Sequence, residues 1–193
     1  MTIEAGIFSH NSNFSERYVP DHGKLEELIS HLKGLGLRIV FTQGVFDLVH
    51  LGHLDYLEKA RSYGDILVVA VDSDEWTKKR KGPGRPIVPE GERLRILTHA
   101  RSVDIITLIN TGIQHGLIQK IRPDTLVVSE TTADFSDETL EIVKGCCGKI
   151  IKLPPQGMTS TSARVRMLAI DGAKELASKI EQLIGKFLRG EAL

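Results

Sequence analysis

The sequence predicts an α/β fold built on a doubly wound parallel sheet. Short apolar runs of strand length alternate with longer stretches of helical periodicity from Lys24 to Leu188. One of these runs, Ile66–Val71, is apolar without interruption, as expected for a parallel strand that helices cover on both faces. The chain of 193 residues is long enough for one such domain with its own core, with or without a terminal extension.

The first elements follow from apolar spacing and from the glycines that interrupt it. Leucine and isoleucine recur at helical spacing over Lys24–Leu37, which predicts a helix, and Arg38–Thr42 is a short buried strand. A helix is expected next from about Leu51 to Tyr63, where Gly64 ends it. The later elements are expected, in order, at Ile66–Val71 (strand), Glu90–Ala100 (helix), Val103–Ile109 (strand), Ile113–Ile121 (helix), Thr125–Val128 (strand), Asp137–Lys144 (helix), Lys149–Leu153 (strand), and Ser162–Ile170 and Ala173–Leu188 (helices).

Composition excludes several classes of protein. The 25 basic and 25 acidic side chains cancel, whereas a protein that coats nucleic acid shows a strong basic excess. The two cysteines, Cys146 and Cys147, are neighbours, so no disulfide framework is expected and a reducing cytoplasm is the natural compartment. No apolar run reaches the roughly 20 residues that span a bilayer, and the polar amino terminus is not typical of a secretory signal.

The segment Thr42–His53 is the first candidate for chemistry, because ligands bind beyond the carboxyl ends of parallel strands. Gly44 follows the buried strand and allows a sharp turn with backbone N–H groups free for an anion. His50 and His53 flank Gly52 at the expected start of a helix, whose positive dipole end favours phosphate. A lone histidine there is more often a cap, and zinc lacks a third ligand at suitable spacing, so no metal site is expected.

A run of cations follows the strand Ile66–Val71. Lys78–Arg85 holds five cations and no acid, and its glycines and proline suit a surface loop. A solvated charge run is the alternative, but the position beside the histidines favours neutralisation of a polyphosphate. Lys81 and Arg85 are the preferred phosphate ligands.

Hydroxyl side chains gather before the first of the two C-terminal helices. Four consecutive ones, Thr159, Ser160, Thr161 and Ser162, exceed what a helix N-cap needs. They suit contacts to the β- and γ-phosphates of a nucleotide, and Arg164 adds charge from the first turn of the helix.

Two of these segments resemble signature motifs of a known enzyme superfamily. The segment Phe46–His53 resembles the HxGH signature of the cytidylyltransferase-like nucleotidyltransferase superfamily, and Gly157–Arg164 resembles its second signature. The resemblance implies a Rossmann-like fold and transfer of a nucleoside monophosphate from a nucleoside triphosphate to a phosphorylated acceptor, with release of pyrophosphate. Class I tRNA synthetases carry a related motif, but this short, neutral chain lacks a tRNA-binding body.

Other segments narrow the resemblance within the superfamily. Lys81–Ile87 and Pro89–Arg93 look like the nucleotidyltransferase domain of ADP-heptose synthase, a likeness that covers residues 24–128. Arg101–Asp104 is closer to the glycerol-3-phosphate and choline-phosphate cytidylyltransferases, although Pro154 stands where those enzymes carry an arginine. Residues 129–132 look more like pantetheine-phosphate adenylyltransferases of archaeal and eukaryotic type, where heptose-type enzymes carry Gly-Gly-Asp.

The resemblance implies a role for each candidate residue. His50 and His53 are expected to bind the α-phosphoryl group as charge builds on it, and Lys81 to hold the leaving pyrophosphate. Nucleotide binding is expected at Gly44, Val45, Phe46, Gly52, Arg93, Arg101, Thr159, Ser160, Thr161, Ser162 and Arg164. Acceptor binding is expected at Asp47, Lys78, Arg85, Ser129 and Glu130.

The predicted activity is transfer of a nucleoside monophosphate from CTP or ATP to a sugar phosphate or polyol phosphate. The alternatives are a pantetheine-phosphate or FMN adenylyltransferase and a non-catalytic nucleotide-binding regulatory subunit. Mg²⁺ is expected to arrive with the triphosphate, and neither nucleic acid nor a membrane is expected as a partner. Residues 1–23 are interpreted as an arm, 24–171 as the nucleotidyltransferase domain and 172–193 as a helix that packs on the core or forms a homodimer.

Overall fold

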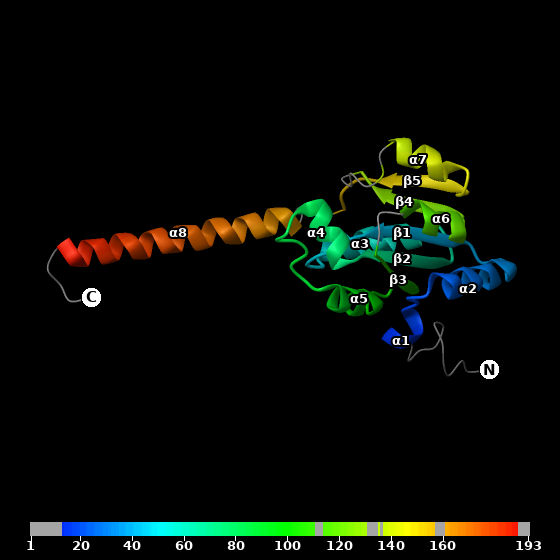
Figure 1. The fold of residues 1–193 in the computed structure, drawn as a ribbon, viewed down its shortest axis with the longest axis horizontal. Helices are drawn as coiled ribbons and strands as arrows, with labels where there is room; N and C mark the ends of the chain where they lie inside the picture. The colour runs from blue at the N-terminus through cyan, green and yellow to red at the C-terminus, as the bar shows by residue number, and fades with distance from the viewer. Residues whose placement is uncertain (1–12, 111–113, 131–134, 136, 157–160, 189–193) are drawn as a thin grey trace. The chain divides into compact units, whose positions relative to one another are not determined.

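A five-stranded parallel sheet forms the centre of the fold in the computed structural model, with strand order β3-β2-β1-β4-β5 (Figure 1). The structure describes residues 13–110, 114–130, 135, 137–156 and 161–188. The chain divides into two compact units, residues 1–158 and 159–193. The doubly wound α/β prediction is confirmed for the first unit, which holds the sheet.

The observed elements follow the predicted alternation of strands and helices. The strands are β1 (Ile39–Gly44), β2 (Ile66–Asp72), β3 (Ile105–Ile109), β4 (Thr125–Ser129) and β5 (Lys149–Leu153). The helices of the first unit are α1 (Phe14–Arg17), α2 (His22–Gly34), α3 (Leu51–Arg61), α4 (Asp74–Lys81), α5 (Glu90–Thr98), α6 (Gln114–Ile121) and α7 (Asp137–Lys144). Neighbouring strands of this sheet run parallel, and β1 lies between β2 and β4.

Two apolar layers sandwich the sheet. One face of the strands packs against buried side chains of α2, α6 and α7, among them Leu25, Ile118 and Val143. The other face packs against α3 and α5, through side chains such as Leu57 and Leu97. Because β2 faces both layers, all seven of its residues are buried, which explains why its run Ile66–Val71 is apolar without a period of two.

The segment Lys78–Arg85 is a loop only in part, which corrects the prediction. Lys78–Lys81 is the last turn of α4, and Gly82 ends that helix with a φ of +94°. The side chain of Ser73 caps the helix by accepting a hydrogen bond from the backbone N–H of Trp76 at 3.1 Å. Acidic residues in the first turn and cations in the last match the helix dipole, so capping and charge order stabilise a helix that has almost no apolar face.

Residues 13–19, part of the segment interpreted as an arm, lie against the sheet. The backbone N–H of Val19 donates to the carbonyl of Ile106 in β3 at 2.9 Å. The hydroxyl of Thr107 donates to the carbonyl of Val19 at 2.7 Å. The Arg17 guanidinium reaches the carbonyls of Thr98 and Val103, each at 3.0 Å, so this segment joins β3 to the end of α5.

The described part of the second unit, residues 161–188, is one helix where the sequence predicts two. Helix α8 (Thr161–Leu188) is continuous through Asp171 and Gly172, because a single glycine costs a helix only about 1 kcal/mol. Among the described residues, no helix is long and apolar enough to cross a membrane.

Prediction: the close approach at Gly64 makes this position intolerant of a side chain. A Cβ there would lie 2.8 Å from the carbonyl oxygen of Arg38 and 2.6 Å from Cγ2 of Val40. We expect Gly64→Ala to destabilise the protein by about 1–3 kcal/mol through overpacking, measured by urea unfolding. Gly34→Ala is the control, because its Cβ would meet nothing within 4 Å. Equal stability of the two variants would contradict this account.

Candidate active site

The candidate site lies at the carboxyl end of β1, the central strand. Strand order reverses at this point, since β2 and β3 extend to one side of β1 and β4 and β5 to the other. Ligands of doubly wound sheets bind in the crevice at this switch point. The hydroxyl of Thr42 donates to the carbonyl of Val127 in β4 at 2.9 Å and lies 2.8 Å from the hydroxyl of Tyr56 in α3. These bonds fix α3 to the two strands that flank the crevice.

The loop after β1 takes an unusual backbone path. Phe46 and Leu48 have φ values of 51° and 47°, a left-handed conformation that costs a side-chain-bearing residue free energy. The Phe46 ring also passes 3.2 Å from the position of a Cβ on Gly44, so a larger residue at 44 would displace the ring. Such a conformation persists only if surrounding contacts hold it.

Asp47 supplies one set of these contacts. Its buried carboxylate accepts hydrogen bonds from the backbone N–H groups of Ile87 (3.0 Å) and Val88 (2.9 Å) and pairs with the Arg85 guanidinium at 2.8 Å. Burial works to raise the pKa of Asp47, but the two N–H groups and Arg85 outweigh it and lower the pKa. Asp47 and Arg85, both predicted to bind the acceptor, therefore tie the loop after β1 to the segment before α5.

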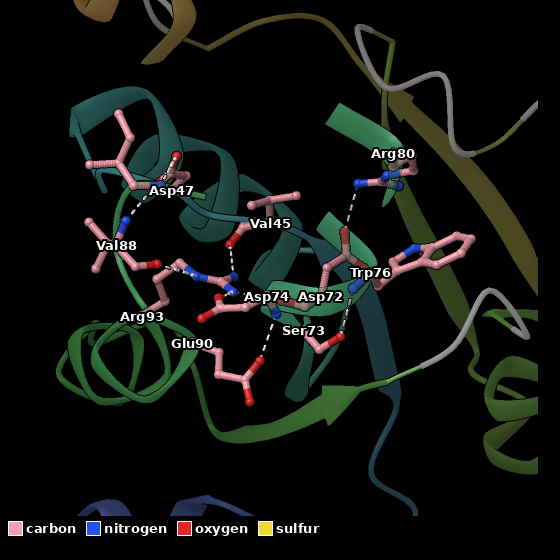
Figure 2. Close-up of polar contacts among 11 residues, drawn as sticks. Val45, Asp47, Asp72, Ser73, Asp74, Trp76, Arg80, Val88, Glu90 and Arg93 are labelled. Carbon is pink, nitrogen blue, oxygen red and sulfur yellow. Dashed lines mark hydrogen bonds and ion pairs between the residues drawn. The ribbon is translucent and has the colours of Figure 1, made fainter. Parts of the chain in front are cut away.

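Arg93 supplies the second set of contacts and is fully buried, with 0% of its surface exposed. Its guanidinium donates to the carbonyls of Val45, Val88 (2.9 Å) and Asp72 (2.8 Å) and to the carboxylate of Asp74 at 2.7 Å (Figure 2). The sequence predicts Arg93 as a nucleotide ligand. In the structure its described hydrogen bonds all go to the protein, where they hold the chain after β1 and after β2.

The two histidines of the motif stack at the start of α3. Their ring centroids lie 4.1 Å apart with an interplanar angle of 27°, and the His53 ring meets the Phe46 ring edge-on with centroids 5.6 Å apart. His50 is the N-cap residue, and its carbonyl accepts the His53 N–H at 2.8 Å. The structure thus brings the predicted pair together at the positive end of the helix dipole.

The electrostatic environment keeps His53 neutral. Burial, followed by the charges of His50 and Lys81, lowers the pKa of His53 to about 4, against a small opposing effect of Asp47. Its Nδ1 atom is buried and has no hydrogen-bond partner among the residues that the structure describes. A neutral imidazole with an unused nitrogen, facing local positive charge, is suited to hydrogen-bond an anion.

Several cations of the predicted polyphosphate site already have carboxylate partners. Arg80 pairs with the buried Asp72 at 2.8 Å, and Lys79 pairs with Glu75 at 2.8 Å on the surface. Lys81 ends α4, and its charge acts on His53. Lys81 is thus the cation of this run that the structure links to the histidines, while Lys78 is exposed in the same turn.

The remaining predicted residues come from the end of β4, the turn before β3 and the start of α8. Ser129 ends β4 beside β1, and the exposed Glu130 follows it, with its N–H bound to the carbonyl of Leu153 at 2.9 Å. Arg101 is exposed in the turn before β3. Thr159 and Ser160 lie outside the described residues. Thr161, Ser162 and Arg164 belong to the first turns of α8, in the second unit, and their side chains lie outside the described part.

Sequence reasoning missed the helix α4 and the Asp72–Arg80 pair. A signal was present, because Ser73 is followed by two acids and then by four cations, the order typical of a capped helix. Among the described residues, no three histidine, cysteine or acidic side chains gather as metal ligands. Two buried carboxylates follow strands β1 and β2, and both are paired with arginine: Asp47 with Arg85 and Asp72 with Arg80.

Comparison with known proteins identifies the family. The model of the cytidylyltransferase-like family matches residues 41–166. The chain is 39% identical over 147 residues to the Bifunctional protein HldE of Aliarcobacter butzleri (strain RM4018), covering 72% of this chain and 30% of that protein. It is 38% identical over 139 residues to the Bifunctional protein HldE of Desulfatibacillum aliphaticivorans, covering 72% and 28%. The chain therefore spans less than a third of these relatives.

Solved structures agree on the fold. The lipopolysaccharide core biosynthesis protein from Thermoplasma volcanium GSS1 aligns with a TM-score of 0.54 and 31% identity, over 61% of this chain and 97% of that one. Pantothenate synthetase from Thermus thermophilus aligns with a TM-score of 0.52 at 14% identity, over 72% and 61%, and this second likeness concerns the fold alone.

Prediction: removing the Arg93 guanidinium destabilises the protein strongly. Arg93→Met leaves the Asp74 carboxylate, two buried carbonyls and the partly buried carbonyl of Val88 without their donor, which we expect to cost about 3–5 kcal/mol. Urea unfolding gives the measurement. Arg95→Met, on the exposed face of the same helix, is the matched control and loses only a contact over the Phe14 ring at 4.7 Å, about 1 kcal/mol. A similar loss in both variants would overturn the role given to Arg93.

Prediction: His53 makes the protein less stable as the pH falls. Its pKa is about 4 when folded and 6.5 ordinarily, so between these values the unfolded chain takes up a proton that the folded chain does not. Stability is full above pH 6.5 and declines below it, by roughly 2 kcal/mol between pH 7 and pH 5. Urea unfolding at both pH values should show a smaller decline for His53→Gln, with the exposed His31→Gln as control. An NMR titration of His53 with a midpoint near 6.5 would refute this.

Proposed function

The chain belongs to the cytidylyltransferase-like family of nucleotidyltransferases, and we propose that it transfers a nucleoside monophosphate from ATP or CTP to a phosphorylated sugar or polyol. One observation carries the proposal. The stacked pair His50 and His53 lies at the positive end of α3, directly beyond the central strand, where an anionic substrate is most strongly stabilised.

The proposed reaction is a direct displacement. A phosphate oxygen of the acceptor forms a bond to the α-phosphorus, and the bond from that phosphorus to the bridging oxygen of the β-phosphate breaks. The electron pair leaves with pyrophosphate, and no covalent enzyme intermediate forms. Catalysis then depends on positioning and on stabilisation of the developing charge.

Each site residue takes part in this proposal through its charge or its hydrogen bonds. His53 donates a hydrogen bond to a non-bridging oxygen of the α-phosphate, and His50 binds beside it. Lys81 neutralises the leaving pyrophosphate. The hydroxyl segment Thr159–Ser162 and Arg164 are proposed as further phosphate ligands from the sequence motif alone. Asp47 and Arg93 shape the loop that carries the backbone of Gly44 and Val45 to the phosphates.

We propose that Mg²⁺ accompanies the triphosphate. The pairing of Asp47 and Asp72 with arginine fits a cation held mainly by phosphate oxygens and water, as Mg²⁺ commonly is. When bound, the ion would neutralise charge on the phosphates. The protein's own contribution is the fixed set of donors around the α-phosphate.

A sugar-phosphate acceptor is favoured by the likeness to the HldE proteins, at 31–40% identity. The segment Arg101–Asp104 keeps CTP in the proposal beside ATP, and residues 129–132 keep a pantetheine-phosphate acceptor as an alternative. The family match argues against a purely regulatory subunit. A cytoplasmic location completes the proposal, and α8 is proposed either to pack on its own core or to pair with a second copy of the chain.

Prediction: His53→Ala lowers kcat at least about 100-fold, because one hydrogen-bond donor to the transition state is lost. Pyrophosphate release is measured with ATP and CTP crossed with heptose 1-phosphate, glycerol 3-phosphate, phosphopantetheine and FMN. The exposed His31→Ala is the matched control and should keep wild-type turnover. Undiminished turnover of His53→Ala would sink the mechanism, and triphosphate binding without pyrophosphate release for any acceptor would favour a regulatory subunit.

A further inference from the structure

Gln43 is a buried polar side chain with no hydrogen-bond partner in the described part of the chain. It lies near the carboxyl end of β1 with 7% of its surface exposed. Both its amide nitrogen and its amide oxygen are orphaned in this way. Nearly all buried polar groups in folded proteins are hydrogen-bonded, so an orphaned amide beside a substrate crevice needs an explanation.

Two further orphans lie on α4, the helix that follows the neighbouring strand. The indole nitrogen of Trp76 and the hydroxyl of Thr77 are both buried without a hydrogen-bond partner among the residues described. Ser73, Trp76, Thr77 and Arg80 are spaced so that they share one face of the helix. Arg80 on that face pairs with Asp72 at 2.8 Å, so this face of α4 is turned to the end of β2.

Strand geometry brings the orphans to the same edge of the sheet. Gln43 pairs in register with Ala70 of β2, and Asp72 lies two residues farther along. Because side chains alternate along a strand, Gln43 lies on the face of Phe41, and Asp72 on the face of Ala70; both faces belong to the layer of α2 and α6. Figure 2 shows the Trp76 indole on the side of Asp72 away from Arg93. Gln43 and the face of α4 that carries Trp76 and Thr77 therefore lie at the same edge of the sheet, on the side opposite α3.

We propose that Gln43, Trp76 and Thr77 form a subsite that hydrogen-bonds the hydroxyl groups of the phosphorylated acceptor. This inference rests on the proposed transfer reaction and assigns its specificity. The histidines stand on one side of the loop after β1 for the phosphoryl group, and the three orphans stand on the other for the body of the acceptor.

The hydrogen-bond donors and acceptors of Gln43, Trp76 and Thr77 favour an acceptor that carries hydroxyl groups. The amide offers two N–H donors and an acceptor oxygen, the indole offers one donor, and the hydroxyl offers both kinds of group. A sugar or polyol carries donors and acceptors on successive carbons and satisfies all three residues. An alkyl phosphate leaves them unpaired, and sites that hydrogen-bond a substrate hydroxyl reject analogues without it by large factors.

A thermal-shift experiment on the full chain tests the subsite apart from catalysis. Wild-type protein should gain Tm in a saturable way with heptose 1-phosphate and much less with ethyl phosphate. Gln43→Met, of similar volume, should lose this gain. Without ligand its Tm should exceed that of the wild type by about 2–4 °C, because an unpaired buried amide has been removed. A structural role for Gln43 would instead lower the ligand-free Tm.

Thr77→Val provides a second variant, with Thr77→Ser as the control that keeps the hydroxyl. In the transfer assay Thr77→Val and Gln43→Met should lower kcat/KM for heptose 1-phosphate about 10-fold or more and leave KM for the nucleotide unchanged.

The outcomes separate this inference from the proposed function. A Tm gain that depends on Gln43, without pyrophosphate release from any acceptor, supports the subsite and refutes the transfer reaction. Transfer to phosphopantetheine that Gln43→Met leaves unaltered overturns the subsite and preserves the reaction. Absence of any Tm gain with heptose 1-phosphate and glycerol 3-phosphate also overturns the subsite.

Discussion

The Arg93 guanidinium is positively charged and fully buried. A buried charge is tolerated only when its N–H groups are hydrogen-bonded to acceptors. Those acceptors are the carbonyls of Val45, Val88 and Asp72 and the carboxylate of Asp74, which come from three separate segments. The desolvation of one guanidinium therefore forces the loops after β1 and β2 and the segment before α5 into a single arrangement. The left-handed residues of the motif loop are held in place by that arrangement and by Asp47.

The electrostatic potential around His50 and His53 is positive. Lys81 and His50 both disfavour a charge on His53, and the end of α3 adds its dipole. The carboxylate that acts against this field, Asp47, is already bound to Arg85. An incoming phosphate is thus the missing counter-charge of the site. The same field that holds His53 neutral in the free protein strengthens its hydrogen bond to an anion.

Sequence reasoning was most successful where a residue's role depends on its neighbours in the chain. The strand β2 is predictable because burial on both faces favours the uninterrupted apolar run Ile66–Val71, and the pair His50 and His53 is predictable from its spacing. Contacts between distant segments are not predictable in this way. Arg85 looks like a phosphate ligand as a cation in a basic run, and Arg93 looks like one from the family resemblance. Only the fold shows their partners 38 and 48 residues away. Gln43 is not predictable as a site residue, because no residue next to it in the sequence indicates that its buried amide lacks a hydrogen-bond partner.

The short segment Phe14–Val19 carries a consequence for handling the protein. It lies along β3, which is otherwise an outer strand of the sheet, and it occupies the hydrogen-bonding groups around Ile106. The opposite outer strand, β5, carries Lys149 and Lys152, charges that discourage edge-to-edge association. A chain trimmed to begin at residue 24 would uncover a β3 edge of isoleucines without such charges, and self-association through that edge would follow.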